Sequence, residues 1–227
     1  MTGVLPPPEL RAARHAALGD PTRVVIVDEL RTSDRSPVEL QRRLRIGSNL
    51  LAHHLDVLAE AGLVERFRSS GDGRRRYVHL VAGVLDGLVD TPTADPAVAL
   101  FVCTHNSARS QLAAALWRQA TGRRATSAGT QPAERVHPGA VAAARRAGLD
   151  LGDAQPRRLG ALPRNTTVVT VCDRAHEELG SLDPAGAPDT LHWSVPDPVP
   201  SGRAGDFDAV VDELRLRITA LTGGRAA

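Results

Sequence analysis

The chain of 227 residues contains no lysine, so arginine supplies all 28 of its strongly basic side chains. Cysteine occurs only as Cys103 and Cys172, which excludes a disulfide scaffold and a zinc site built from clustered cysteines. No apolar run approaches the roughly 20 residues that span a bilayer, and the amino terminus lacks the pattern of a secretory signal. Two separate thiols suit a reducing compartment. We therefore expect a cytoplasmic protein that contacts no membrane.

A strong excess of either charge is also absent, since 26 acidic residues leave a formal net charge of only +2. The hydrophobic fraction is 42%, which is enough to bury real cores in a chain of this length. The length indicates one large domain or two small ones.

Residues 98–111 place a thiol and a guanidinium around one short loop. A buried-strand pattern ends at Cys103, and an Ala/Leu-rich helical pattern begins near Ser107. The first N–H groups of that helix and its dipole favour an oxyanion above the loop. Arg109 can grip two oxygens of the anion, and the same field favours the thiolate form of Cys103, to which Ser110 can donate a proton. The alternative is a buried structural cysteine beside a surface arginine.

The run from Phe101 to Gln111, FVCTHNSARSQ, resembles the phosphate-binding loop of low-molecular-weight protein tyrosine phosphatases. It is more similar to that of the related thiol-dependent arsenate reductases, because Asn106 and the Ser-Gln ending favour the reductase branch. The resemblance implies an α/β fold with a doubly wound parallel sheet and no bound cofactor. It implies an oxyanion cradle made of Thr104, His105, Asn106, Ser107, Ala108 and Arg109.

Two later positions complete the predicted site. Asp197 precedes a proline in a loop and matches the family's Asp-Pro loop, so it is the candidate general acid, although a turn-forming Asp-Pro is the alternative. Cys172 ends a second buried-strand pattern, at the sheet edge where ligands bind in open parallel sheets. The resemblance implies that it is the resolving thiol, which attacks the Cys103 adduct.

One departure from the family concerns the electron donor, because Leu179 stands where thioredoxin-coupled reductases carry a further cysteine. The resemblance therefore implies an external reductant, namely a small cellular thiol with a glutaredoxin-like protein, and thioredoxin remains the alternative.

The first third of the chain predicts four helices, over residues 9–18, 22–30, 36–45 and 49–61, followed by a hairpin of strands at 63–68 and 74–80. Asp20 before Pro21 and Ser36 with Glu39 are helix-start signals. The last helix is expected to bury Leu51, Leu55, Leu58 and Ala59. Two helices joined by a glycine-containing turn indicate a helix-turn-helix.

The phrases ALGDPTR at 17–23 and LAHHLDVLAEAGLV at 51–64 resemble winged helix-turn-helix repressors of the ArsR type. That resemblance implies a homodimer that binds operator DNA, with Ser48, Asn49, His53 and His54 facing the bases. Arg68, Arg74, Arg75 and Arg76 would hold phosphates. The third helix lacks the cysteines of metal-sensing members, so no metal site is expected. A helical adaptor with a solvated basic hairpin is the alternative.

We therefore expect a DNA-binding domain at 1–90, a linker at 91–97, and an arsenate reductase or phosphatase-like domain at 98–224. The predicted function is reduction of arsenate to arsenite through a Cys103–arsenate adduct, joined to transcriptional regulation of arsenic resistance. One alternative is a repressor whose second domain only senses an oxyanion or a redox state. The other is a tyrosine phosphatase.

Overall fold

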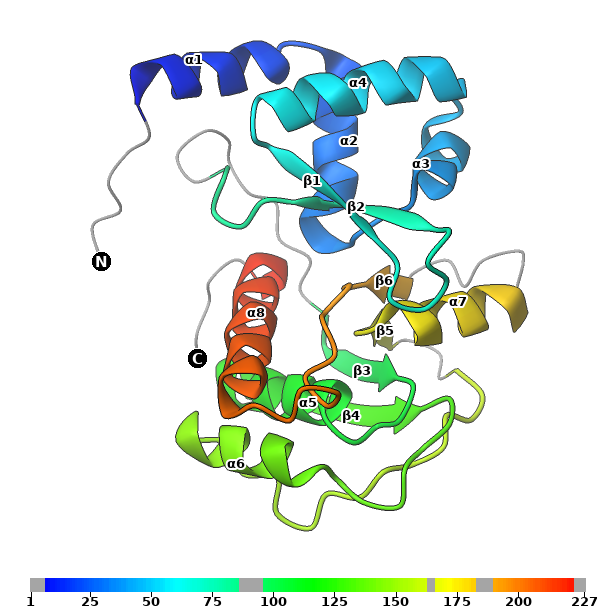
Figure 1. The fold of residues 1–227 in the computed structure, drawn as a ribbon, viewed down its shortest axis with the longest axis vertical. Coiled ribbons are helices and arrows are strands. Elements are labelled where there is room, and N and C mark those ends of the chain that lie inside the picture. The colour runs from blue at the N-terminus through cyan, green and yellow to red at the C-terminus, as the bar shows by residue number, and fades with distance from the viewer. Residues whose placement is uncertain (1–6, 86–95, 163–165, 183–189, 223–227) are drawn as a thin grey trace. The chain divides into compact units, whose positions relative to one another are not determined.

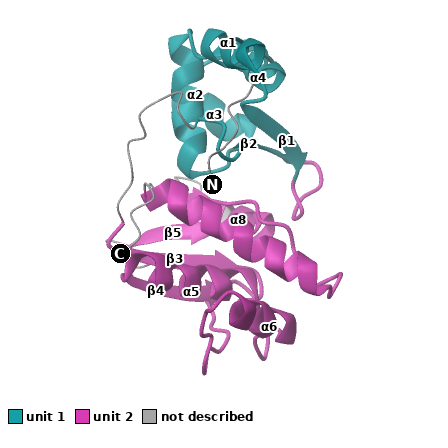
Figure 2. Cartoon of the chain, turned by 90° about the vertical axis from the view of Figure 1, so that its left-hand side faces the viewer, with its two compact units in different colours: residues 1–68, 75–91 teal, residues 69–74, 92–227 magenta. Residues whose placement is uncertain are grey.

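The computed structural model describes residues 7–85, 96–162, 166–182 and 190–222. The chain divides into two compact units (Figure 2). Unit 1 comprises residues 1–68 and 75–91, and unit 2 comprises residues 69–74 and 92–227. Most of the linker expected at 91–97 lies outside the described residues.

In its described residues, unit 1 folds into four helices and one antiparallel hairpin, which Figure 1 labels. The helices are α1 (Pro8–Ala17), α2 (Pro21–Thr32), α3 (Pro37–Leu44) and α4 (Ser48–Glu60), and the strands are β1 (Val64–Arg68) and β2 (Arg76–Leu80). The sequence signals set two of these starts. The Asp20 carboxylate accepts hydrogen bonds from two backbone N–H groups of α2, and Ser36 and Glu39 form a reciprocal capping box at α3.

The core of unit 1 lies beneath α4, which buries Leu51, Leu55 and Leu58 as the periodicity predicts. Two details of the predicted face were wrong. Ala59 is exposed, whereas His54, which was expected to face DNA, is only 5% exposed. At helical spacing His54 is one position from Leu55 and four from Leu58, so it lies at the border of the apolar face.

Unit 2 is built on a four-stranded parallel sheet in the order β4-β3-β5-β6. Its strands are β3 (Val98–Cys103), β4 (Arg124–Gly129), β5 (Thr167–Thr170) and β6 (Thr190–His192). Its helices are α5 (Arg109–Thr121), α6 (Pro138–Arg146), α7 (Asp173–Leu182) and α8 (Ala204–Thr222). The connections β3–β4 and β5–β6 run in opposite directions across the sheet, so right-handed crossovers place α5 and α7 on opposite faces.

This architecture confirms the expected α/β fold with an open parallel sheet, with two additions and one shift. Helix α7 and the three-residue strand β6 were not predicted from the sequence. Helix α5 begins at Arg109 rather than near Ser107, so residues 104–108 form a longer open loop than predicted. The extra length leaves more backbone available to surround a ligand.

The core of unit 2 packs helix α5 against β3, β4 and α8. Phe101 of β3 is fully buried between Trp117 of α5 and Trp193, with ring centroids 6.0 and 5.8 Å apart. Rigid aromatic packing around the Phe101 side chain helps to fix the position of this strand and its carboxyl end. Cys103 lies at that end.

Candidate functional site

The loop after β3 turns its backbone carbonyls outward. The carbonyl oxygens of Cys103, Thr104, His105 and Ser107 accept hydrogen bonds of 2.8–3.2 Å from backbone N–H groups of residues 130–137. Since the N–H of a peptide points opposite to its C=O, these bonds direct the loop's amide groups toward the other side. The loop therefore turns several N–H donors to one side, and such a set of donors can hold an oxyanion.

Asn106 fixes the shape of this loop. Its backbone is left-handed, with φ of 49°, a conformation that Asn tolerates better than most residues. Its fully buried side chain accepts hydrogen bonds from the Arg157 backbone and from Gln111, and donates one of 2.8 Å to the Ser110 hydroxyl. The predicted role of Asn106 in tying down the loop is consistent with this geometry.

A glycine at the end of β4 allows the loop to lie close to the next strand. A Cβ atom on Gly129 would come within 2.7 Å of the Thr104 carbonyl oxygen and 3.0 Å of the Asn106 Cβ. Only a residue without a side chain fits there. This contact explains why the Ser-Ala-Gly sequence at 127–129 ends in glycine.

The Cys103 thiol is 3% exposed and lies at the centre of the loop. Its sulfur accepts a hydrogen bond from the Asn106 N–H at 3.1 Å and lies 3.0 Å from the Ser110 hydroxyl. Both groups stabilise negative charge on sulfur when the hydroxyl donates. Asn106 holds Ser110 in turn, so donors to the sulfur come from a prearranged network.

Arg109, at the start of α5, joins the loop to the loop that follows β6. Its guanidinium is 6% exposed, donates to the Val195 carbonyl oxygen at 3.0 Å, and lies 2.9 Å from the Asp197 carboxylate. Asp197 also accepts a hydrogen bond from the backbone N–H of Val199, which forms a turn at Asp197-Pro198. The structure thus brings together Arg109, the predicted oxyanion-binding arginine, and Asp197, the predicted general acid.

Cys172 lies just beyond β5, at the same sheet edge as Cys103. It is 2% exposed, and its sulfur lies 3.4 Å from the hydroxyl of Thr104, the residue after Cys103. Burial raises the pKa of the Cys172 thiol; Arg109 lowers it and the charge on Cys103 raises it again, with a net increase. The two thiols therefore share one buried site.

Sequence analysis missed four polar residues around this site. Gln111 donates to the Asn106 carbonyl oxygen, and Thr170, Asp173 and His192 form a buried hydrogen-bonded group beside Cys172. A sequence signal existed for two of them. Asp173 follows a candidate thiol directly, and His192 is a polar residue in the short apolar run that precedes the Asp-Pro loop.

The candidate DNA-contacting residues of unit 1 are arranged differently. Ser48, Asn49 and His53 are exposed on the first two turns of α4, and the arginines at 68, 75 and 76 are also exposed. His54 is buried, with Nδ1 lying 3.9 Å from the Asp20 carboxylate, so it does not offer its ring to DNA. Arg74 is exposed in the 69–74 segment, which groups with unit 2.

Within the described residues, no three His, Cys, Asp or Glu side chains come together as metal ligands. No helix in that part of the chain is both long enough and apolar enough to cross a membrane.

Comparison with known sequences covers both units. Residues 98–225 match the family described as low molecular weight phosphotyrosine protein phosphatase, and residues 18–66 match a helix-turn-helix domain. An arsenate reductase from Bacillus cereus (strain Q1) is 34% identical over 125 residues, which is 52% of this chain and 88% of that protein. An arsenate reductase from Brevibacillus brevis is 32% identical over 123 residues, with the same coverage.

Solved structures support the fold of unit 2. The tyrosine phosphatase AmsI from Erwinia amylovora is 19% identical, covers 61% of this chain and 99% of its own, and superposes with a TM-score of 0.51. The tyrosine phosphatase Wzb from Escherichia coli K30 is 21% identical, with coverage of 56% and 96% and the same TM-score. The sequence resemblances stated above are thus confirmed. The chain belongs to the low-molecular-weight phosphotyrosine protein phosphatase family, and it carries a helix-turn-helix domain ahead of that family's domain.

Proposed function

We propose that unit 2 reduces arsenate to arsenite with Cys103 as nucleophile and Cys172 as resolving thiol, and that unit 1 binds operator DNA. The observation that carries the enzymatic part is the Cys172 sulfur, 3.4 Å from the Thr104 hydroxyl inside the oxyanion loop. A phosphatase needs one thiol and a water molecule, whereas a reductase needs a second thiol within reach of the first. The arsenate reductases named above support the same choice.

Without a ligand, the guanidinium of Arg109 pairs with Asp197. In the first step, the oxyanion binds in the loop and replaces Asp197 as the partner of that guanidinium. The Cys103 thiolate attacks arsenic, an As–S bond forms, and one oxygen leaves as water. Asp197, released from Arg109, is positioned to supply the proton for that leaving oxygen. The loop N–H groups and Arg109 stabilise the charge on the remaining oxygens.

In the second step, the Cys172 thiolate attacks the sulfur of Cys103. The S–S bond forms, the As–S bond breaks, and its electron pair stays on arsenic, which passes from As(V) to As(III) and leaves as arsenite. The two thiols supply both electrons and end as a disulfide. The Thr104 hydroxyl, 3.4 Å from Cys172, can stabilise the attacking thiolate.

Regeneration then requires an external reductant. Leu179, which occupies the position of a further cysteine in thioredoxin-coupled reductases, packs against the core of unit 2 and offers no thiol. We propose a small cellular thiol with a glutaredoxin-like protein as the donor and a cytoplasmic location. No bound cofactor enters any step.

The test is arsenite production from arsenate by the purified chain, with small-thiol/glutaredoxin and thioredoxin systems supplied in turn. Wild type, Cys103→Ser and Cys172→Ser are compared. We expect turnover in the wild type only, with the small-thiol system the faster donor. Turnover that survives Cys172→Ser unchanged would remove the internal disulfide from the mechanism.

The same proteins distinguish the alternatives. Rapid hydrolysis of aryl phosphates that depends on Cys103 but not on Cys172, without arsenite production, would indicate a phosphatase. Tight oxyanion binding without turnover of either substrate would indicate a sensor.

For unit 1 we propose sequence-specific binding to operator DNA by a homodimer, with α4 as the recognition helix. The supporting observations are the helix-turn-helix match at residues 18–66 and the exposed polar start of α4 at Ser48 and Asn49. Mobility-shift assays with DNA upstream of the chain's own gene test this proposal. Binding that is independent of sequence and of protein dimerisation would contradict it. Adding arsenate or arsenite to the assay shows whether either species releases the DNA.

A further inference from the structure

Three polar side chains beside Cys172 are almost completely buried and take no part in the steps described above. Thr170, Asp173 and His192 are each no more than 1% exposed. Asp173 follows Cys172 directly and is the first residue of α7, while His192 is the last residue of β6. The Nε2 atom of His192 lies 3.2 Å from the Asp173 carboxylate. A buried hydrogen bond, which is an ion pair when His192 is protonated, thus joins the segment of the second thiol to the strand that leads to Asp197.

The surroundings of His192 favour a second proton on its ring. Its Nδ1 atom lies 2.9 Å from the Thr170 hydroxyl, which also lies 3.3 Å from the Nδ1 atom of His176 and 3.2 Å from the Leu191 carbonyl oxygen. When the hydroxyl donates to Leu191, its oxygen accepts a proton from Nδ1 of His192, while Nε2 faces a carboxylate. This arrangement favours the imidazolium form of His192.

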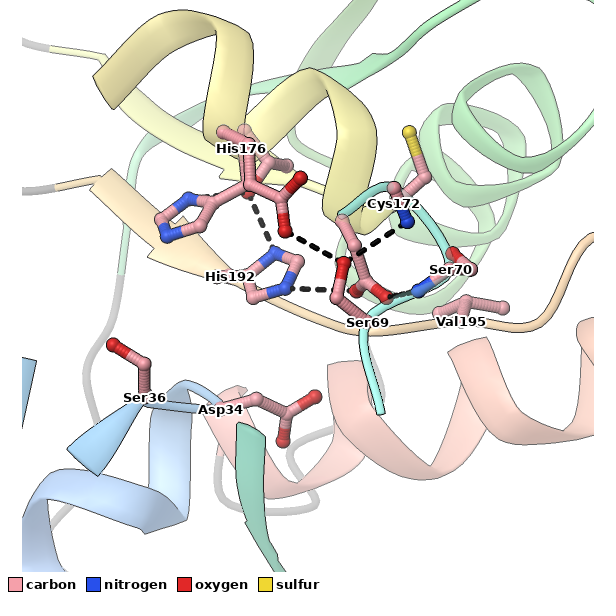
Figure 3. Close-up of polar contacts among 12 residues, drawn as sticks. Asp34, Ser36, Ser69, Ser70, Cys172, His176, His192 and Val195 are labelled. Atoms are coloured by element: carbon pink, nitrogen blue, oxygen red, sulfur yellow. Dashed lines mark hydrogen bonds and ion pairs between the residues drawn. The ribbon is translucent and has the colours of Figure 1, made fainter. Parts of the chain in front are cut away.

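The remaining neighbours of the pair are also polar. The Asp173 carboxylate accepts hydrogen bonds from the Ser70 backbone N–H, at 2.6 Å, and from the Ser194 side chain. The His176 ring stacks on His192, with centroids 4.1 Å apart (Figure 3). A buried ion pair contributes little net stability compared with apolar residues of the same size. Its location next to a reactive thiol therefore points to a role in the chemistry.

We propose that Asp173 and His192 are positioning residues for the second thiol. The pair fixes the first turn of α7, so that the Cys172 sulfur stays against Thr104, and its two charges cancel beside that sulfur. His192 also anchors the chain three residues before Val195, whose carbonyl oxygen accepts the hydrogen bond from Arg109. This inference rests on the proposed role of Cys172 in reduction.

Cancelling charges give a test that packing alone does not satisfy. The other charged groups that act on Cys172 are Arg109 and Cys103. His192→Gln retains an N–H donor but leaves the Asp173 charge uncompensated, so the pKa of the Cys172 thiol rises. Asp173→Asn removes the carboxylate that holds the second proton on His192, so the buried ring becomes neutral and no net charge remains beside the sulfur. We expect His192→Gln to raise the pKa of Cys172 by about one unit, the usual size for a nearby charge, and Asp173→Asn to leave it close to that of the parent protein.

The measurement is the pH dependence of iodoacetamide alkylation at Cys172, followed by mass spectrometry in the full chain carrying Cys103→Ser. The double substitution of Asp173→Asn with His192→Gln should return the profile close to that of the parent protein. Equal shifts in the two single variants, or faster alkylation at every pH with no shift, would show that the pair only packs the structure and would overturn the proposal.

A second measurement separates this inference from the proposed function. With Cys103 present, arsenate is added once and formation of the Cys103–Cys172 disulfide is timed. Both single variants should form it at least about tenfold more slowly, while competition between phosphate and arsenate for the loop stays unchanged. If the wild type forms no disulfide, the reductase proposal fails, and the alkylation profiles still decide the role of the pair.

A third approach does not depend on the two variants folding. Thr170→Val removes the acceptor of Nδ1 and should raise the pKa of Cys172 in the same direction as His192→Gln, by a smaller amount. In the wild-type chain, nitrogen-15 NMR of His192 should show both ring nitrogens protonated at neutral pH. A neutral ring would overturn the proposal.

Discussion

The two units place their functional side chains in opposite environments. Around Cys103 the polar groups are buried and hydrogen-bonded to one another, so that each one determines the position of the next. On α4 of unit 1, Ser48, Asn49 and His53 are exposed and project from a helix whose other face forms the core. Chemistry on a small anion requires a fixed, water-poor cradle, whereas DNA binding requires an accessible surface.

The contrast predicts how each unit responds to substitution. Changes in the oxyanion site should alter both geometry and stability, because the same bonds serve both. Changes on the exposed part of α4 should alter binding and leave stability nearly constant. The predictions below test this contrast, starting with the largest expected effect.

Arg109→Lys should lower kcat/KM for arsenate by about 10²–10³-fold, because lysine cannot hold two oxygens at once. A lysine side chain also cannot contact the Val195 carbonyl oxygen and the Asp197 carboxylate at the same time in the way that the Arg109 guanidinium does. The measurement is steady-state kinetics with the preferred thiol donor. Arg146→Lys, at an exposed ion pair with Asp208 elsewhere in unit 2, is the matched control and should leave kcat/KM unchanged. Equal effects of the two changes would contradict the assigned role of Arg109.

Two substitutions at Asn106 separate the effect of its left-handed backbone from the effect of its side-chain hydrogen bonds. Both Asn106→Gly and Asn106→Ala lose the hydrogen bonds with Ser110 and Arg157. Only alanine is also strained at φ of 49°, so it should destabilise unit 2 by about 1 kcal/mol more than glycine does. Thermal unfolding of the transition that belongs to unit 2 measures the difference. Equal stability of the two variants would show that the loop relaxes.

Asp173 should make the stability of unit 2 depend on acid pH. Burial raises the pKa of this carboxyl, but hydrogen bonds from His192, Ser194 and Ser70 lower it by more than burial raises it. The resulting pKa is about 2, below the usual value for aspartate. Because the folded-state pKa is depressed, the stabilisation is complete above the unfolded pKa near 4 and is lost as pH falls toward 2. The shift corresponds to about 2 kcal/mol.

Unfolding of wild type and Asp173→Asn between pH 7 and pH 2 measures this effect. The stability difference between the two should shrink over the interval from about pH 4 to pH 2. Asp208→Asn, at a half-exposed ion pair, is the control and should show a difference within about 1 kcal/mol at every pH. A wild-type advantage that stayed constant down to pH 2 would contradict the depressed pKa.

Unit 1 should show the smallest effects and no change in folding. Asn49→Ala should weaken operator binding about tenfold while leaving binding to unrelated DNA unchanged, as expected for a base contact. Arg76→Ala should weaken binding to all DNA by a few-fold and reduce the slope of log affinity against log salt by about one. Titrations at several salt concentrations measure both. Loss of thermal stability in either variant would contradict the contrast between the two units.

The sequence predicted elements of both units well where its signals are local. The strand before Cys103, the capping box at Ser36 and the helix start at Pro21 depend on a few neighbouring residues. The parallel-strand rule also predicted that Cys172 would lie at the same sheet edge as Cys103. Its contact with Thr104 fits that expectation.

The sequence could not predict features that depend on distant residues. His192 and Asp173 are 19 positions apart and meet only because β5 and β6 are adjacent in the sheet. Strand β6 has three residues, too few for a periodic pattern. The burial of His54 was missed because a histidine at the border of an apolar face follows neither the core pattern nor the surface pattern.

The most direct test of the account is a single turnover without external thiol. The reduced chain is mixed with one equivalent of arsenate, and arsenite and the Cys103–Cys172 disulfide are both quantified by mass spectrometry. We predict close to one arsenite and one disulfide per chain, with neither product from Cys172→Ser. Arsenite released without the disulfide, or no arsenite from a chain that still hydrolyses aryl phosphates, would contradict reduction by this pair of thiols.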